Sequence, residues 1–243
     1  MDVPSAAELL HAWERAQARP AVQRPIEILA ALQGAPPEKM QSLPLGERDA
    51  RVLTLFQEIF GSQIEGLAEC PHCQAPVEFS APASSLRLDA PDRGDLLKVE
   101  NAGFTVSFRL PNSADLAAIA IESDPGTARA KLFQRCVLDA FDEDGRPAPA
   151  GELPAELIGL AAEKMGAADP QSDIVFVLRC PSCDASWEAP FDIVSFFLSH
   201  LHAWAKRLLL EVHEIASSYG WREAEILALS TVRRRAYLDL LRP

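Results

Sequence analysis

Apolar residues recur at three- and four-residue spacing along much of the chain, which predicts amphipathic helices. Three helices are predicted before the first cysteine: one whose capping-box residues are Ser5 and Glu8, one at 26–33 and one at 45–60. The longest apolar stripe predicts a single helix over about residues 191–218. Both ends of the chain are therefore expected to be helical.

The middle of the chain mixes two patterns. Apolar residues alternate on either side of residues 101–103, and this turn contains Gly, so the segment is predicted to form a hairpin. Helices are predicted at 115–121, from Pro125 through Ala140 and at 155–165. We therefore expect an α+β fold that is mainly helical.

The motif Cys-Pro-x-Cys occurs twice, as CPHC at Cys70–Cys73 and as CPSC at Cys180–Cys183. In both copies Ala follows two residues after the second Cys, and Glu follows five residues after it. A strand-like run precedes each copy, and a stretch that can return as a second strand follows it. Each motif is therefore predicted to form the tight turn of a short hairpin.

Two such turns can supply four thiolates to one tetrahedral zinc ion. The repeated motif therefore predicts one structural Zn²⁺ per chain, held in a split zinc ribbon made of two hairpins. Gly is frequent after the second Cys of such turns, whereas this chain has Gln74 and Asp184, for which a left-handed backbone costs more. The predicted ligands are Cys70, Cys73, Cys180 and Cys183.

The alternative is a cytosolic thiol–disulfide oxidoreductase that uses Cys70 and Cys73. In such enzymes the motif continues into a helix whose N-terminus lowers the pKa of the first thiol. Here Pro76 and β-like residues follow the motif, and a redox role gives no reason for a second copy. The sequence favours structural zinc, and we expect no catalytic function.

These patterns divide the chain into segments. The segment between the two motifs is long enough to form a subdomain of its own. The expected division is an N-terminal helical region at 1–61, a split zinc ribbon at 62–82 and 172–190, an inserted α+β subdomain of a hairpin plus helices at 83–171, and C-terminal helices at 191–243.

Charge and composition limit the possible partners. The formal net charge of -12 and the acidic residues of both hairpins disfavour nucleic-acid binding. No run approaches the roughly 18 apolar residues of a membrane span, and the N-terminus does not resemble a signal peptide. We expect a cytoplasmic protein with reduced thiols, in which Cys136 is a small core residue, and with no small-molecule substrate.

The order of motifs resembles the baseplate hub assembly chaperone family of contractile-tailed bacteriophages and related contractile injection systems. The resemblance extends from about Leu45 to Leu241 and rests on LGERDARVLTLFQEIFG, CPHC, FRLPNSADLAA, RCPSCDASWEAPFDI and YGWREAEILALSTVRRRAYLDLL. It implies a non-catalytic cytosolic factor whose partners are hub or spike proteins. It also implies that the four cysteines of the two motifs bind zinc, and it carries over no catalytic residue.

Two short helices are predicted near the C-terminus, at 222–229 and 232–241. Their aromatic and Arg side chains are candidate anchors for a partner, because such residues dominate interface hot spots. Alternatively, the two aromatic residues tie the last helices to the long helix. The candidates are Trp221, Arg233, Arg234, Arg235 and Tyr237.

Overall fold

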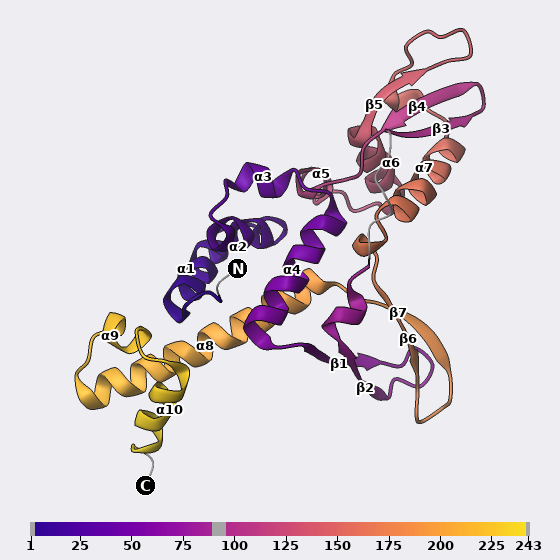
Figure 1. Cartoon of the computed structure of the whole chain (residues 1–243). Helices are drawn as coiled ribbons and strands as arrows, with labels where there is room; N and C mark the ends of the chain where they lie inside the picture. Colours follow the sequence, from indigo (N-terminus) through magenta and orange to yellow (C-terminus); the bar gives the residue numbers. More distant parts are fainter. Residues whose placement is uncertain (1–2, 89–95, 242–243) are drawn as a thin grey trace. The chain divides into compact units, whose positions relative to one another are not determined.

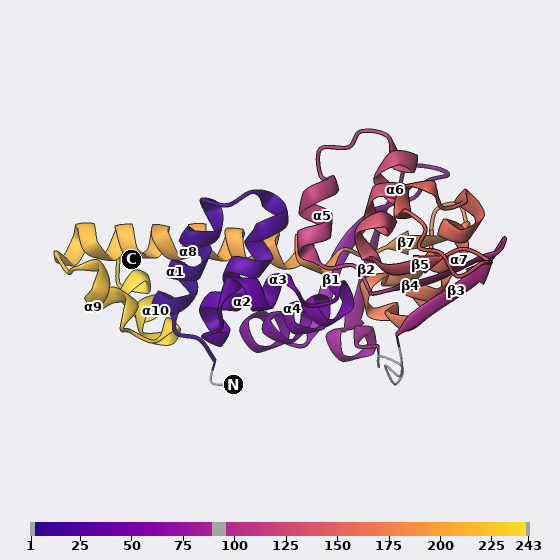
Figure 2. The same cartoon turned by 90° about the horizontal axis from the view of Figure 1, so that it is seen from above.

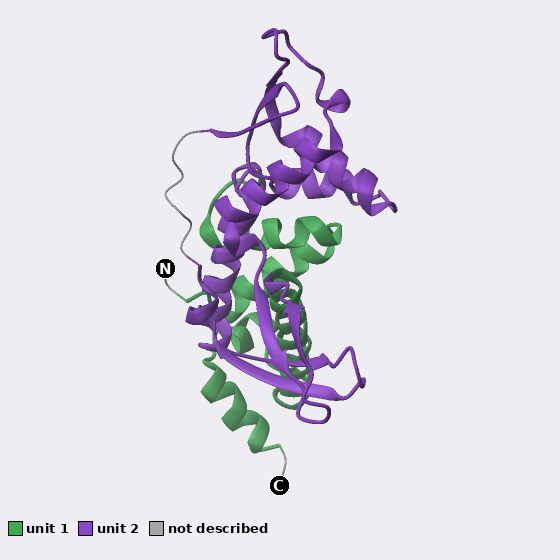
Figure 3. Ribbon diagram, turned by 90° about the vertical axis from the view of Figure 1, so that its right-hand side faces the viewer, with its two compact units in different colours: residues 1–37, 194–243 green, residues 38–193 purple. Residues whose placement is uncertain are grey.

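The computed structural model describes residues 3–88 and 96–241, within which the chain is mixed α+β and mainly helical (Figure 1). The chain divides into two compact units, residues 1–37 with 194–243 and residues 38–193 (Figure 3). The predicted N-terminal, inserted and C-terminal segments each include a few residues outside this description.

The first unit is built from helices. As predicted, Ser5 and Glu8 form a capping box: the Ser5 Oγ accepts a hydrogen bond from the Glu8 N–H at 3.3 Å, and Glu8 Oε2 accepts one from the Ser5 N–H at 2.8 Å. The helices are α1 (Ala6–Gln17), η1 (Ala21–Gln23), α2 (Arg24–Gln33), α8 (Ile193–Tyr219), α9 (Glu223–Leu227) and α10 (Thr231–Asp239).

The core of this unit forms along α8, which is one continuous helix (Figure 2). The apolar stripe that predicts α8 supplies buried residues at three- and four-residue spacing, which pack against Leu10, Ile226 and Leu238. The prediction of one long helix is confirmed. The buried α8 residues of this core are Ala205, Leu208, Val212 and Ile215.

The second unit combines helices with antiparallel sheets in the strand orders β1-β2, β3-β4-β5 and β6-β7. Its helices are α3 (Pro37–Gln41), α4 (Leu45–Phe60), η2 (Ala83–Leu86), α5 (Ser113–Ile119), α6 (Pro125–Cys136), η3 (Ala150–Glu152), α7 (Ala155–Ala168) and η4 (Pro170–Ser172). Its strands are β1 (Gln63–Glu69), β2 (Pro76–Pro82), β3 (Leu97–Asn101), β4 (Phe104–Phe108), β5 (Val137–Phe141), β6 (Val175–Arg179) and β7 (Ser186–Pro190).

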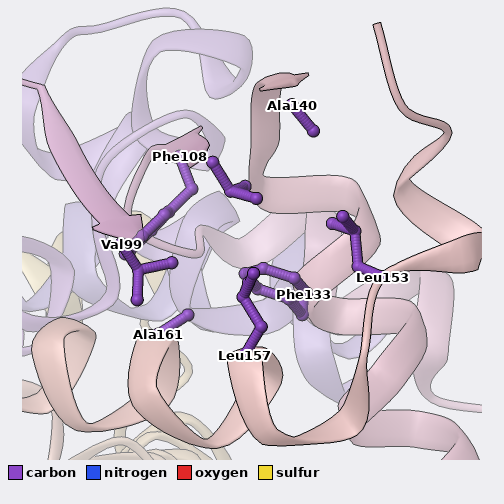
Figure 4. Packing of buried hydrophobic residues seen from close by; sticks show 8 residues of the cluster. Val99, Phe108, Phe133, Ala140, Leu153, Leu157 and Ala161 are labelled. Carbon is purple, nitrogen blue, oxygen red and sulfur yellow. The ribbon is translucent and has the colours of Figure 1, made fainter. Parts of the chain in front are cut away.

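The residues between the two cysteine motifs have their own core. Leu157 and Ala161 point from α7 toward Val99 and Phe108 of the three-stranded sheet (Figure 4). Phe133 of α6 meets Phe108 edge-on, with ring centroids 6.0 Å apart. The alternating apolar residues of the predicted hairpin therefore face these two helices.

The prediction of a helix from Pro125 through Ala140 is wrong. The helix α6 ends at Cys136, and the next five residues form β5. Ala140 lies opposite Val106 of β4 and is buried in the core of the sheet. Pairing with β4 decides the conformation here, because strand preference depends on cross-strand packing more than on the residue itself.

A buried carboxylate ties this sheet to two helices. The side chain of Asp115 is 0% exposed and accepts hydrogen bonds from Arg109 at 2.6 and 3.0 Å and from Arg135 at 3.0 Å. Burial opposes ionisation, but the guanidinium of Arg109, the N–H of Asn112 and then Arg135 outweigh it. They hold the pKa of Asp115 below its usual value.

Across the described ranges, every helix is too short or too polar to cross a lipid bilayer.

Candidate metal centre

The two cysteine motifs form the turns of β1-β2 and β6-β7, as the sequence predicts. The turns have matching hydrogen bonds. The Cys70 N–H donates to the Ala75 carbonyl at 3.0 Å, and the Cys180 N–H donates to the Ala185 carbonyl at 2.9 Å. The same local sequence thus builds the same turn twice.

The residue after each second Cys adopts the left-handed conformation that Gly favours. The φ angles are 61° at Gln74 and 58° at Asp184. This conformation lets their N–H groups donate back to the carbonyls of Cys70 and Cys180, at 2.9 and 3.0 Å. Both turns therefore carry backbone strain that glycine would avoid.

The turns bring four sulfur atoms together. The Sγ atoms of Cys70 and Cys183 lie 3.7 Å apart, and those of Cys73 and Cys180 lie 3.6 Å apart. All four lie within 4.8 Å of one another. Cys70 and Cys180 are buried, whereas Cys73 and Cys183 are exposed.

These separations fit a tetrahedral metal ion. Two thiolates bound to one zinc ion at about 2.3 Å would lie about 3.8 Å apart, close to the two shortest separations found here. A disulfide would bring two sulfurs to about 2.05 Å, and all five cysteines of the chain are free thiols. The cluster is therefore compatible with a metal site in which cysteine fills every coordination position.

Backbone N–H groups favour negative charge at one of the four sulfurs, that of Cys180. Burial of the Cys180 sulfur disfavours ionisation, but the N–H groups of Ser182 and Cys183 and the nearby thiols outweigh burial and lower the pKa of Cys180 to about 6. The Ala185 N–H favours the thiolate of Cys183, but burial and the neighbouring thiols raise its pKa to about 12. One charge is thus held at Cys180, and metal binding would release the remaining thiol protons.

An aromatic cluster joins the two hairpins. The ring of Phe79 on β2 lies 4.9 Å from that of Phe176 on β6, and Phe191 lies 5.2 Å from Phe176. Phe79 also covers Gly66 of β1, where a Cβ atom would come within 2.4 Å of the ring. Sequence reasoning missed this cluster; its signal is an aromatic residue in each hairpin and a Gly in the facing strand.

Neither motif continues into a helix. Each is followed by a strand, β2 or β7, so neither first thiol stands at a helix N-terminus. Cys136 lies apart from the cluster: it is 0% exposed, and burial raises its pKa to about 11. This agrees with its prediction as a small core residue.

The candidate aromatic anchors contact each other. The rings of Trp221 and Tyr237 lie 4.8 Å apart, and both contact Tyr219 at the end of α8, at 5.2 and 5.6 Å. All three pack against the core along α8. They therefore help hold the last helices on α8, and whether they also contact a partner stays a prediction.

The candidate arginines differ in their surroundings. Arg234 is 3% exposed, donates to Glu211 at 3.1 Å and to the carbonyl of Leu229 at 2.8 Å. Arg233 and Arg235 are exposed, and the guanidinium of Arg233 lies 6.0 Å from the ring centre of Tyr237. The run of three arginines thus contains one structural residue and two at the surface.

Comparison with known proteins gives one match. A family model described as T4 bacteriophage base plate protein matches residues 25–198. This range contains both cysteine motifs, the inserted sheet and the start of α8. Searches of curated proteins and of solved structures found no match.

Proposed function

The chain belongs to the T4 bacteriophage base plate protein family, and from this membership we propose that it is a non-catalytic assembly chaperone or adaptor. Its clients are hub or spike proteins of a phage-like contractile injection machine. It acts in the cytoplasm through protein contact alone, without a nucleic acid, membrane or small-molecule substrate. The family match over most of the chain carries the proposal.

We also propose that Cys70, Cys73, Cys180 and Cys183 hold one structural Zn²⁺ in a split ribbon. The spacing of the sulfurs and the supply of four thiols support it. When bound, the ion cross-links the two hairpins. Because thiols fill all four positions, no open position is left for a substrate, which supports a structural role over a catalytic one.

The net charge of the chain is consistent with a chaperone that binds its clients transiently. A charge of -12 keeps the chain soluble and favours clients with basic surfaces. Binding that depends on such attraction weakens as salt rises, because ions screen exposed charges beyond about 8–10 Å. We therefore expect client binding to be salt-sensitive.

Co-expression with the hub and spike proteins of the same particle tests the proposal. We expect one of them to become more soluble and to co-purify with this chain, while a sheath protein from the same particle, as the control client, is unchanged. Equal solubility of every hub and spike component with and without this chain would contradict the proposal. A disulfide-exchange activity that Cys70→Ser abolishes would instead favour an oxidoreductase.

A further inference from the structure

The four thiols of the two cysteine motifs differ in their access to solvent. Cys73 and Cys183 are exposed, whereas the other two are 0% exposed. The exposed sulfur of Cys73 lies 3.6 Å from the buried sulfur of Cys180 on the other hairpin. In the same way, the exposed sulfur of Cys183 lies 3.7 Å from the buried sulfur of Cys70. We call these the cross-hairpin pairs, each made of one accessible and one protected thiol.

We infer that the cross-hairpin pairs are an oxidation site, at which peroxides form the two disulfides Cys73–Cys180 and Cys70–Cys183. The inference adds a form of regulation to the proposed zinc site and rests on the same four thiols. It does not require the metal, because it concerns which sulfurs lie next to each other.

The chemistry needs only the two sulfurs of a pair and a peroxide. The exposed sulfur, as thiolate, attacks the O–O bond and becomes a sulfenic acid, while the second oxygen leaves as hydroxide or alkoxide. The buried sulfur, as thiolate, then attacks the sulfenic sulfur, so that the S–S bond forms, the S–O bond breaks and hydroxide leaves. With hydrogen peroxide, each pair loses two electrons and two protons, and the oxidant is reduced to water.

The pairing determines what oxidation does to the fold. Metals bind the thiolate, so formation of the disulfides releases a bound ion. Cross-hairpin disulfides then replace the ion as the link between β1-β2 and β6-β7, whereas a disulfide within one motif would leave the hairpins unlinked. The oxidised protein should therefore keep its two hairpins together without a metal.

The unfolded chain favours the other pairing. Within one motif three positions separate the two cysteines, whereas 113 and 107 positions separate the cross-hairpin pairs. The entropy of loop closure favours the shorter loop by about two orders of magnitude. The folded protein opposes this preference, because the rings of Phe79 and Phe176, 4.9 Å apart, hold one hairpin on the other. Cross-hairpin disulfides are thus a product of the fold.

Disulfide mapping by mass spectrometry tests the inference. The purified protein is treated with hydrogen peroxide as isolated, and a sample unfolded in urea serves as the control. We expect Cys73–Cys180 and Cys70–Cys183 in the folded protein, and disulfides within each motif in urea. Cys136 should stay reduced in the folded protein, because it is buried apart from the cluster. Disulfides within the motifs of the folded protein, or no disulfide there, would overturn the inference.

The order of oxidation is tested with dimedone, which traps sulfenic acids. In the folded protein we expect dimedone to label Cys73 and Cys183 about tenfold more than the two buried cysteines, because oxidation follows exposure. Equal labelling of all four cysteines would overturn the inference.

Two glycine variants provide a matched comparison. Gly66→Ala places a methyl group against the Phe79 ring, so it should shift the disulfides of the folded protein toward pairs within each motif. Gly159→Ala, where a Cβ atom meets open space, should leave the pairing unchanged. The same pairing in both variants would contradict the role of the ring contact.

Zinc content before oxidation separates this inference from the proposed zinc site. Protein that contains no zinc but forms the cross-hairpin disulfides would contradict the zinc site and support the inference. Protein that contains zinc but forms disulfides within each motif would support the zinc site and overturn the inference.

Discussion

The Sγ atoms of Cys70 and Cys183 lie 3.7 Å apart, although 113 positions separate the two residues in the sequence. The second short contact, between Cys73 and Cys180, also joins the two hairpins. Each close pair thus combines one thiol from each motif. A metal bound here would cross-link two distant points of the chain and restrict the long segment between them.

Loss of one of the four thiols should therefore destabilise the folded protein. We expect Cys183→Ser to lose the metal and to lower the free energy of unfolding by roughly 4–5 kcal/mol, the entropic value of closing a loop of about 100 residues. Urea denaturation together with elemental analysis measures both effects. Cys136→Ala is the control, because that thiol lies outside the cluster and its loss should leave the metal content unchanged. Full metal content in Cys183→Ser would contradict the assignment.

The strained turn at Gln74 predicts a stabilising change. Gln74→Gly should raise the free energy of unfolding by up to about 1 kcal/mol, because relief of the left-handed strain exceeds the entropy that Gly adds to the unfolded chain. Gln74→Ala keeps the Cβ atom and should give no such gain. Denaturation of the metal-loaded variants distinguishes the two, and a less stable Gln74→Gly protein would show that the turn is not strained.

The close approach at Gly66 predicts the opposite effect. Gly66→Ala should lower the free energy of unfolding by about 1–3 kcal/mol, because the added methyl group would overlap the Phe79 ring and displace it from Phe176. Gly159→Ala in α7 is the matched control: its methyl group meets open space and should stabilise the helix by about 0.5–1 kcal/mol. Thermal unfolding measures the melting temperatures of the Gly66→Ala and Gly159→Ala variants. Equal melting temperatures would contradict this account of the hairpin interface.

The buried Asp115 predicts a pH-dependent contribution to stability. Its pKa is lowered in the folded protein, so its contribution is complete above the ordinary value of about 3.9 and is lost as the pH falls below it. Asp115→Asn should cost about 2–3 kcal/mol at pH 7 and less near pH 3. Urea denaturation of both proteins across this range measures the difference. A difference that does not change with pH would show that the charge of Asp115 is not what stabilises the fold.

Local signals predicted much of the helical structure. The capping box of α1, the Gly that ends α2 and the apolar stripe of α8 act over a few residues, so the sequence displays them directly. The segment of β5 has no such signal. Its conformation depends on pairing with β4, which brings together residues about thirty positions apart.

The metal centre was also predictable in part. A repeated motif with a fixed spacing identifies Cys70 and Cys183 as members of one cluster, but it does not give the pairs that lie closest or the order of the thiol pKa values. Both depend on how the hairpins pack through Phe79 and Phe176. The division of the arginine run depends likewise on Glu211, which lies 23 positions before Arg234.

Assembly of baseplates in the absence of this chain tests the central claim most directly. Electron microscopy would count completed baseplates in extracts that contain every other component of the particle, before and after the purified protein is added. We predict that completed baseplates accumulate only after addition. Baseplates that complete at the same rate without the protein would contradict its role in assembly.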